Sequence, residues 1–208
     1  NTARHRTALA GAGLLNALGK ENHMAVRSSM AYIITFVREL IEDPAGASQK
    51  FTDQQIQDRL DLNRLDLYQS DLREVDNLMT DGTIEWHDFF ASYPFWETDY
   101  QIQKVNGVNV TANTAEPLIG KFHFTTHQST PLIITGKVYN VYGVASTLLT
   151  MWIAEVRSQI QMWTADGTTV QRIGQISSMQ GLAAKYASMA WGWGNTTQIK
   201  LVRRDLRN

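Results

Sequence analysis

Residues 131–156 read PLIITGKVYNVYGVASTLLTMWIAEV, and two different patterns meet within them. The beginning, PLIITGKVY, predicts a short strand. From Val138 to Trp163, apolar residues recur at three- and four-residue steps, which predicts one long amphipathic helix. We expect the strand to pass into the helix within ITGKVYNVYG, where Gly136 and Gly143 ease close packing. The core face of this helix is expected to carry Tyr142, Leu148, Leu149, Trp152 and Val156.

The same stretch contains seventeen consecutive uncharged residues, from Val138 to Ala154. That length is at the lower limit for a membrane-spanning helix. The run includes an Asn, a Ser and two Thr, and its periodicity is that of a helix with one buried face. The pattern therefore favours a helix packed within a protein, and we expect no membrane partner.

Two shorter helices are predicted upstream. MAYIITFVRELIED has apolar residues at helical spacing and ends at the breakers Pro44 and Gly46. A second helix restarts in FTDQQIQDRLDLNRLDL, where Thr52 and Gln55 form a predicted capping box. The leucines that follow shift toward an alternating rhythm, so we expect this helix to end near Asn63.

Residues 84–100, IEWHDFFASYPFWETDY, contain seven aromatic side chains. Such a segment can serve as a stacking platform for nucleic-acid bases. However, the segment carries four acidic residues and no Lys or Arg, so it would repel a phosphate backbone. Packing in a core or a subunit interface is the favoured interpretation.

The middle of the chain predicts β-structure. Asn106-Gly107 lies between two extended runs and is a strong hairpin signal. With GKFHFTTH and PLIITGKVY, residues 98–139 predict a three- or four-stranded meander inserted between helices. His123 and His127 could share one face of a strand, but no third ligand lies nearby in the sequence, so we expect no metal site.

A turn at 165–167, a helix over Gln175–Trp191 and an extended basic end, TTQIKLVRRDLRN, complete the chain. The expected fold class is α+β, mainly α: a helical bundle with long central and C-terminal helices and an inserted small antiparallel β meander. The expected divisions are an N-terminal extension or flexible arm (1–23), a helical and aromatic-rich part (24–97), the β insert (98–139), a helical core (140–192) and an extended basic tail (193–208).

The charges are unevenly distributed. Residues 43–99 carry thirteen acids and four bases, whereas residues 137–208 carry eight bases and three acids. These segments, with balances of −9 and +5, can attract each other within a chain or between copies. The alternative is a solvated acidic loop and a basic tail. A solvated acidic face is predicted for Asp58, Asp61, Asp66, Asp71, Glu74 and Asp76.

No enzyme motif is present in the sequence. The absence of cysteine excludes disulfides, thiolate metal sites and cysteine nucleophiles. The GAG at 11–13 lacks the context of a dinucleotide-binding loop, and there is no phosphate-binding lysine loop, nucleophile elbow or two-histidine zinc helix. We expect no enzymatic activity and no cofactor; a carboxylate-based hydrolase is a remote alternative.

The order of parts from FTDQQIQDRLDLNRLDL through FWETDYQIQ, ITGKVYNVYGVASTLLT and ADGTTVQR to IKLVRRDL resembles the head–tail adaptor (connector) proteins of long-tailed bacteriophages. The resemblance covers residues 50–208. It implies a virion protein that forms a ring, usually of twelve copies, beneath the portal. Its expected partners are other copies of itself, the portal protein, a tail-proximal neck or tail-completion protein, and packaged DNA that passes through the channel without sequence reading.

The basic tail is the predicted contact with the portal or a neighbouring copy, where it can add a strand to a sheet edge. The residues concerned are Lys200, Arg203, Arg204 and Arg207. The same bases could touch DNA phosphates. The alternative function is therefore a nucleic-acid-binding regulator that uses the last helix and the tail.

Overall fold

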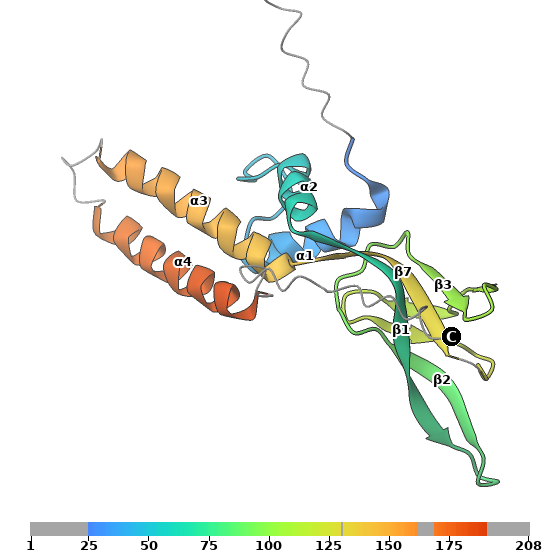
Figure 1. The fold of residues 1–208 in the computed structure, drawn as a ribbon. Coiled ribbons are helices and arrows are strands. Elements are labelled where there is room, and N and C mark those ends of the chain that lie inside the picture. Colours follow the sequence, from blue (N-terminus) through green and yellow to red (C-terminus); the bar gives the residue numbers. More distant parts are fainter. Residues whose placement is uncertain (1–24, 130, 162–168, 191–208) are drawn as a thin grey trace, which may run out of the picture.

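The computed structural model describes residues 25–129, 131–161 and 169–190. Helices lie at one end of the molecule and a β-sheet at the other (Figure 1). The helices are η1 (Ser28–Met30), α1 (Ala31–Ile41), α2 (Asp53–Leu62), α3 (Val141–Gln161) and α4 (Thr169–Met189). The strands are β1 (Arg64–Leu78), β2 (Ile84–Phe90), β3 (Gln101–Lys104), β4 (Asn109–Val110), β5 (Thr114–Glu116), β6 (Lys121–His123) and β7 (Leu132–Tyr139).

The predicted fold class, a helical bundle with a small inserted meander, is wrong. The described residues form four α-helices and a seven-stranded antiparallel sheet that curls into a half-barrel, in the order β4-β3-β7-β1-β2-β6-β5. The sheet is larger than predicted because it begins at Arg64, so that β1 and β2 add to the strands of residues 98–139. Most side chains of β1 are exposed, and many of them are charged. The sequence of β1 therefore lacks the apolar pattern by which a strand is usually predicted.

β1 joins the two halves of the sheet. Up to Leu72 it pairs with β7, and from Arg73 onward it pairs with β2. A β-bulge sets Tyr68 and Gln69 opposite Thr135 alone, and the Gln69 N–H donates to Thr135 Oγ1 at 3.0 Å. Bulges increase the local twist of a strand. This change of partner at Leu72, together with the twist, leaves the second half of β1 with β2 as its one strand neighbour among the described residues.

Two local signals read from the sequence are confirmed, and a third is confirmed in part. Thr52 and Gln55 form a capping box at the start of α2, and Asn63 is the C-cap of that helix. Asn106-Gly107 turns the chain between β3 and β4, which pair in antiparallel register. The predicted Gln175–Trp191 helix is present as α4, but it begins earlier than predicted, at Thr169, and Trp191 lies outside the described residues.

The passage from strand to helix at residues 136–143 is also confirmed. β7 ends at Tyr139, and Asn140 caps α3 by accepting a hydrogen bond from the Gly143 N–H at 3.1 Å. A Cβ at position 143 would lie 2.7 Å from the Asn140 amide nitrogen, and one at position 136 would lie 3.0 Å from the Cβ of Tyr100. Both glycines therefore permit close approach of neighbouring groups, as predicted.

The face of α3 that lies against α1, α2 and α4 forms the helical core. Leu148 and Leu149 are buried in it, whereas Tyr142, Trp152 and Val156 are half-buried at its margin. Of the five residues expected on the core face, two are thus buried in this core and three pack against its margin. Trp163 lies outside the described residues. On α4, the residues buried against this core are Ile176, Met179, Ala183 and Tyr186.

The aromatic segment at 84–100 packs as predicted, and it connects two cores. Phe95 belongs to the helical core, and its neighbour Trp96 belongs to the sheet core with Phe89. Trp96 and Phe89 are almost fully buried. Adjacent residues of one segment therefore fasten the helices to the sheet.

We predict that Leu149→Ala lowers the free energy of unfolding by about 2–5 kcal/mol, because it leaves a cavity in a buried site. Met151, on the same helix and 41% exposed, is the matched control. Met151→Ala should change stability by less than about 1 kcal/mol. Urea denaturation followed by circular dichroism measures both; equal effects would contradict the placement of this helix.

Candidate interaction surfaces

The carboxylate of Glu97 is fully buried where the helices meet the sheet. It accepts hydrogen bonds from Ser29 Oγ at 2.6 Å, from Arg27 Nε at 2.9 Å and from the Tyr139 hydroxyl. Lys137 Nζ lies 3.5 Å from the same carboxylate. A buried charge requires such partners, because without them its desolvation would be strongly destabilising.

Arg27 extends this buried network to α2. Its guanidinium makes a bidentate pair with Asp61, at 3.0 and 2.6 Å, and its backbone N–H donates to Gln57 Oε1 at 2.7 Å. Asp61 is therefore an ion-paired residue, and the prediction that it belongs to a solvated acidic face is wrong. Hydrogen bonds through Arg27 and Glu97 connect the N-terminal segment, α2, β7 and the loop before β3.

The network shifts the pKa values of its members. Burial raises the pKa of Glu97, because it disfavours the charged carboxylate. The hydrogen bonds from Ser29, Tyr139 and Arg27 lower that pKa, and their combined effect is larger, so the pKa lies below its usual value. Burial and the Glu97 charge both raise the pKa of Tyr139 far above its ordinary range. Glu97 is therefore a carboxylate at neutral pH, and Tyr139 is a neutral donor.

A buried cation, Arg38, fixes the loop between α1 and α2. Its guanidinium donates to Asp53 Oδ1, to the Phe51 carbonyl and to Asp43. Asp43 in turn accepts from the backbone N–H groups of Lys50 and Phe51. All of these groups are satisfied internally, so this cluster has a structural role.

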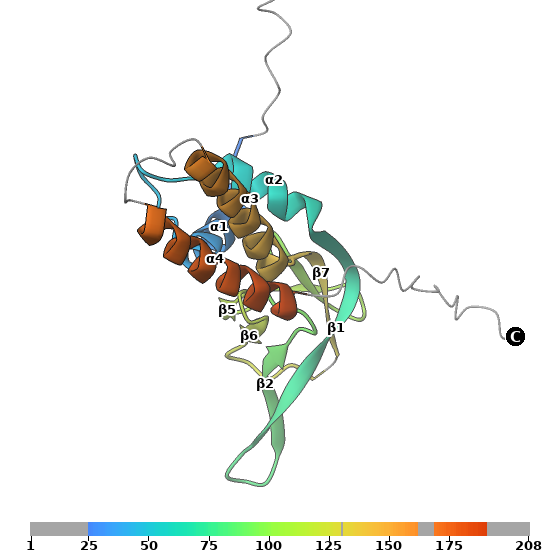
Figure 2. The same cartoon turned by 90° about the vertical axis from the view of Figure 1, so that its left-hand side faces the viewer.

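The far ends of β1 and β2 form a hairpin that projects from the body of the molecule (Figure 2). Three large apolar side chains at its end are exposed: Leu78 (76%), Ile84 (53%) and Met79 (40%). Leu78 and Ile84 are paired across the strands. We call residues 78–84 the tip; exposed apolar side chains gathered on a projection are typical of a contact with another molecule.

The hairpin that bears the tip is acidic. Asp81 Oδ1 accepts from the Thr83 N–H at 2.9 Å and from Thr83 Oγ1 at 2.7 Å, and these bonds lower the pKa of Asp81. From Glu74 to Asp88 the hairpin carries five acids and no Lys or Arg. The tip was not predicted, although Asp81-Gly82 between Leu78 and Ile84 is a strong hairpin signal.

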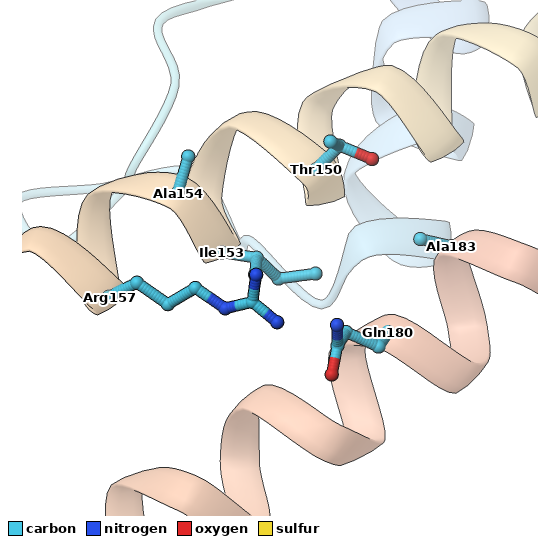
Figure 3. Close-up of a pocket in the computed structure, with 6 residues that line it drawn as sticks. All are labelled: Thr150, Ile153, Ala154, Arg157, Gln180 and Ala183. Carbon is cyan, nitrogen blue, oxygen red and sulfur yellow. The ribbon is translucent and has the colours of Figure 1, made fainter.

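A groove lies between α3 and α4, on the side of the molecule away from the tip (Figures 1 and 3). Its volume is about 310 Å³, and Ile153, Ala154 and Ala183 supply its apolar lining. Thr150, Arg157 and Gln180 complete the lining, and the Arg157 guanidinium points toward Gln180 (Figure 3). We call this the α3–α4 groove; its one charged lining group is basic.

The two histidines considered as metal ligands have other partners. His123 Nδ1 lies 3.1 Å from Asp88, and His127 Nδ1 accepts from the Trp86 N–H at 2.9 Å. His87, which the sequence analysis did not single out, contacts Glu85. Among the residues that the structure describes, no cluster of His, Cys, Asp or Glu is arranged to hold a metal ion.

Several predicted site residues lie outside the described part of the chain. These include the tail residues Lys200, Arg203, Arg204 and Arg207, as well as the arm at 1–23. The structure therefore neither supports nor contradicts those predictions. None of the helices that the structure describes is both long enough and apolar enough to cross a bilayer.

Comparisons with protein-family models, with curated proteins and with solved structures give no significant match for this chain. The resemblance to head–tail adaptors therefore rests on the sequence patterns alone.

We predict that Glu97→Gln lowers the free energy of unfolding by about 3 kcal/mol, because Arg27 loses a buried anionic partner. The matched control is Asp99→Asn, which removes an exposed partner of Lys137 and should matter by at most about 1 kcal/mol. The pH dependence provides a second readout. Because the pKa of Glu97 is lower in the folded chain, its stabilisation is present above the unfolded-state pKa of about 4.3 and is lost as pH falls through the folded pKa.

Glu97→Gln should therefore flatten the acid side of the stability curve, as measured by chemical denaturation between neutral and acidic pH. An unchanged acid limb in the variant would contradict the role assigned to this carboxylate.

Proposed function

We propose that this protein is a structural subunit that assembles into a ring with copies of itself and connects a bacteriophage capsid to its tail. The observation that carries the assembly role is the projecting β1–β2 hairpin with its exposed tip of Leu78, Met79 and Ile84. Burying these three apolar side chains against a partner surface would remove them from water, which stabilises the contact.

The shape of the subunit supports this proposal. The tip and the α3–α4 hairpin lie on opposite sides of one body (Figure 1). A subunit with two different contact surfaces binds its neighbours heterologously, and such contacts generate closed rings when the rotation closes. The buried Arg27–Glu97 network supports the same role, because it fixes the sheet that bears one surface to the helices that bear the other.

The capsid-to-tail location and the portal partner come from the sequence resemblance. In this proposal the protein acts in the virion, at the head–tail junction, and the basic tail from Lys200 to Arg207 contacts the portal. DNA then passes through the ring without being read. The regulator alternative is not favoured, because α4 carries two basic residues, Arg172 and Lys185, and duplex binding requires several phosphate contacts.

The test is to mix the purified chain with the portal ring of the phage that encodes it and to measure particle mass. The expected result is a complex in which the portal gains about twelve chains, each of 23.5 kDa. A chain without residues 199–208 should keep its cooperative melt but bind the portal less well. If the full chain remains a free monomer beside the portal, the proposed function is wrong.

A further inference from the structure

The tip and the α3–α4 groove match each other in chemistry. The tip presents three apolar side chains, Leu78, Met79 and Ile84, in an acidic hairpin. The groove presents an apolar lining with Arg157 at its side and no acidic lining residue. The nearest acid along α3, Glu155, is already paired with Lys50. An apolar contact with complementary charges at its rim is the usual composition of a specific protein interface.

A tip cannot occupy the groove of its own chain, because the two surfaces lie on opposite sides of the molecule (Figure 1). We propose that the β1–β2 tip of one copy inserts into the α3–α4 groove of the next copy. This proposal rests on the proposed function, since it names the contact that would build the ring. The contact is heterologous, so that every copy donates one tip and receives one.

A second apolar groove, between α2 and α3, is a weaker match. Its volume is about 320 Å³, and Phe51, Leu148 and Met151 line it. However, both Asp58 and Arg59 belong to its lining. With one acid and one base, this lining has no net charge to attract the acidic hairpin, whereas the lining of the α3–α4 groove has a base and no acid. The charge of the lining therefore selects the α3–α4 groove.

The absence of cysteine from the chain permits a direct test by disulfide trapping. One full-length chain carries Met79→Cys in the tip, and a second carries Gln180→Cys in the groove. The two chains are mixed in equal amounts and mildly oxidised, with and without the portal ring. The disulfide between positions 79 and 180 should form about tenfold faster than the 79–79 and 180–180 disulfides, because docking raises the effective concentration of the two thiols. Met151→Cys, in the second groove, is the matched control for Gln180→Cys.

The rim charges and the apolar tip are tested in the same assay. Asp81→Asn, which keeps an acceptor for Thr83, and Arg157→Gln should each lower the trapping yield about two- to fivefold. If the two charges meet, the two changes together should lower the yield no further than either alone. Leu78→Ser should lower it about tenfold or more. The matched controls are Lys185→Gln and Val105→Ser, which alter a base and an exposed apolar residue outside both surfaces.

Trapping at 79–180 that exceeds the control pairs and falls in the charge variants supports the contact. Equal trapping at 79–151 and 79–180, or a yield that Arg157→Gln leaves unchanged, overturns it. If rings form on the portal without 79–180 trapping, this contact is wrong and the proposed function stands. If neither rings nor trapped pairs form, both are wrong.

Discussion

The burial of the Glu97 carboxylate is the constraint on which the arrangement of the molecule depends. A buried carboxylate is tolerated only when hydrogen-bond donors surround it. Here the donors come from the N-terminal segment, through Arg27 and Ser29, and from β7, through Tyr139. Arg27 then connects the same carboxylate to Asp61 on α2. The helical end and the sheet end cannot shift relative to each other without separating these groups.

The chain crosses this junction twice, side by side. α2 leads directly into β1, and β7 leads directly into α3, with the Asn140 N–H donating to the Asn63 carbonyl at 3.1 Å. From there β1 runs out to the tip, and α3 runs along the groove. The relative positions of tip and groove are therefore set by the pairing of β1 with β7 and by the hydrogen-bonded network of Arg27 and Glu97. A subunit built in this way can present two surfaces at a defined angle, which ring closure requires.

The sequence predicted those features that depend on neighbours along the chain. The capping box of Thr52 and Gln55, the Asn106-Gly107 hairpin and the strand-to-helix passage at Gly136–Gly143 are all local, and all are confirmed. The second half of β1 was missed because hydrophobicity does not follow burial there: the half-buried Asn77 is polar, whereas the exposed Leu78 is apolar. The pairing of Arg27 with Glu97, seventy residues apart, has no local signal at all. Of the two interaction surfaces, the tip had a readable turn at Asp81-Gly82, whereas the groove arises from the packing of α4 on α3.

The measurement that tests two-ended assembly most directly is amide hydrogen exchange of the chain, free and assembled on the portal ring. Backbone amides of the tip, from Met79 to Ile84, should exchange more slowly in the assembly, together with amides of α3 and α4 around Ala154 and Ala183. Amides of β3 and β4, which lie on neither surface, should exchange at unchanged rates. Slower exchange confined to other surfaces, with the tip unchanged, would contradict assembly through the tip and the groove.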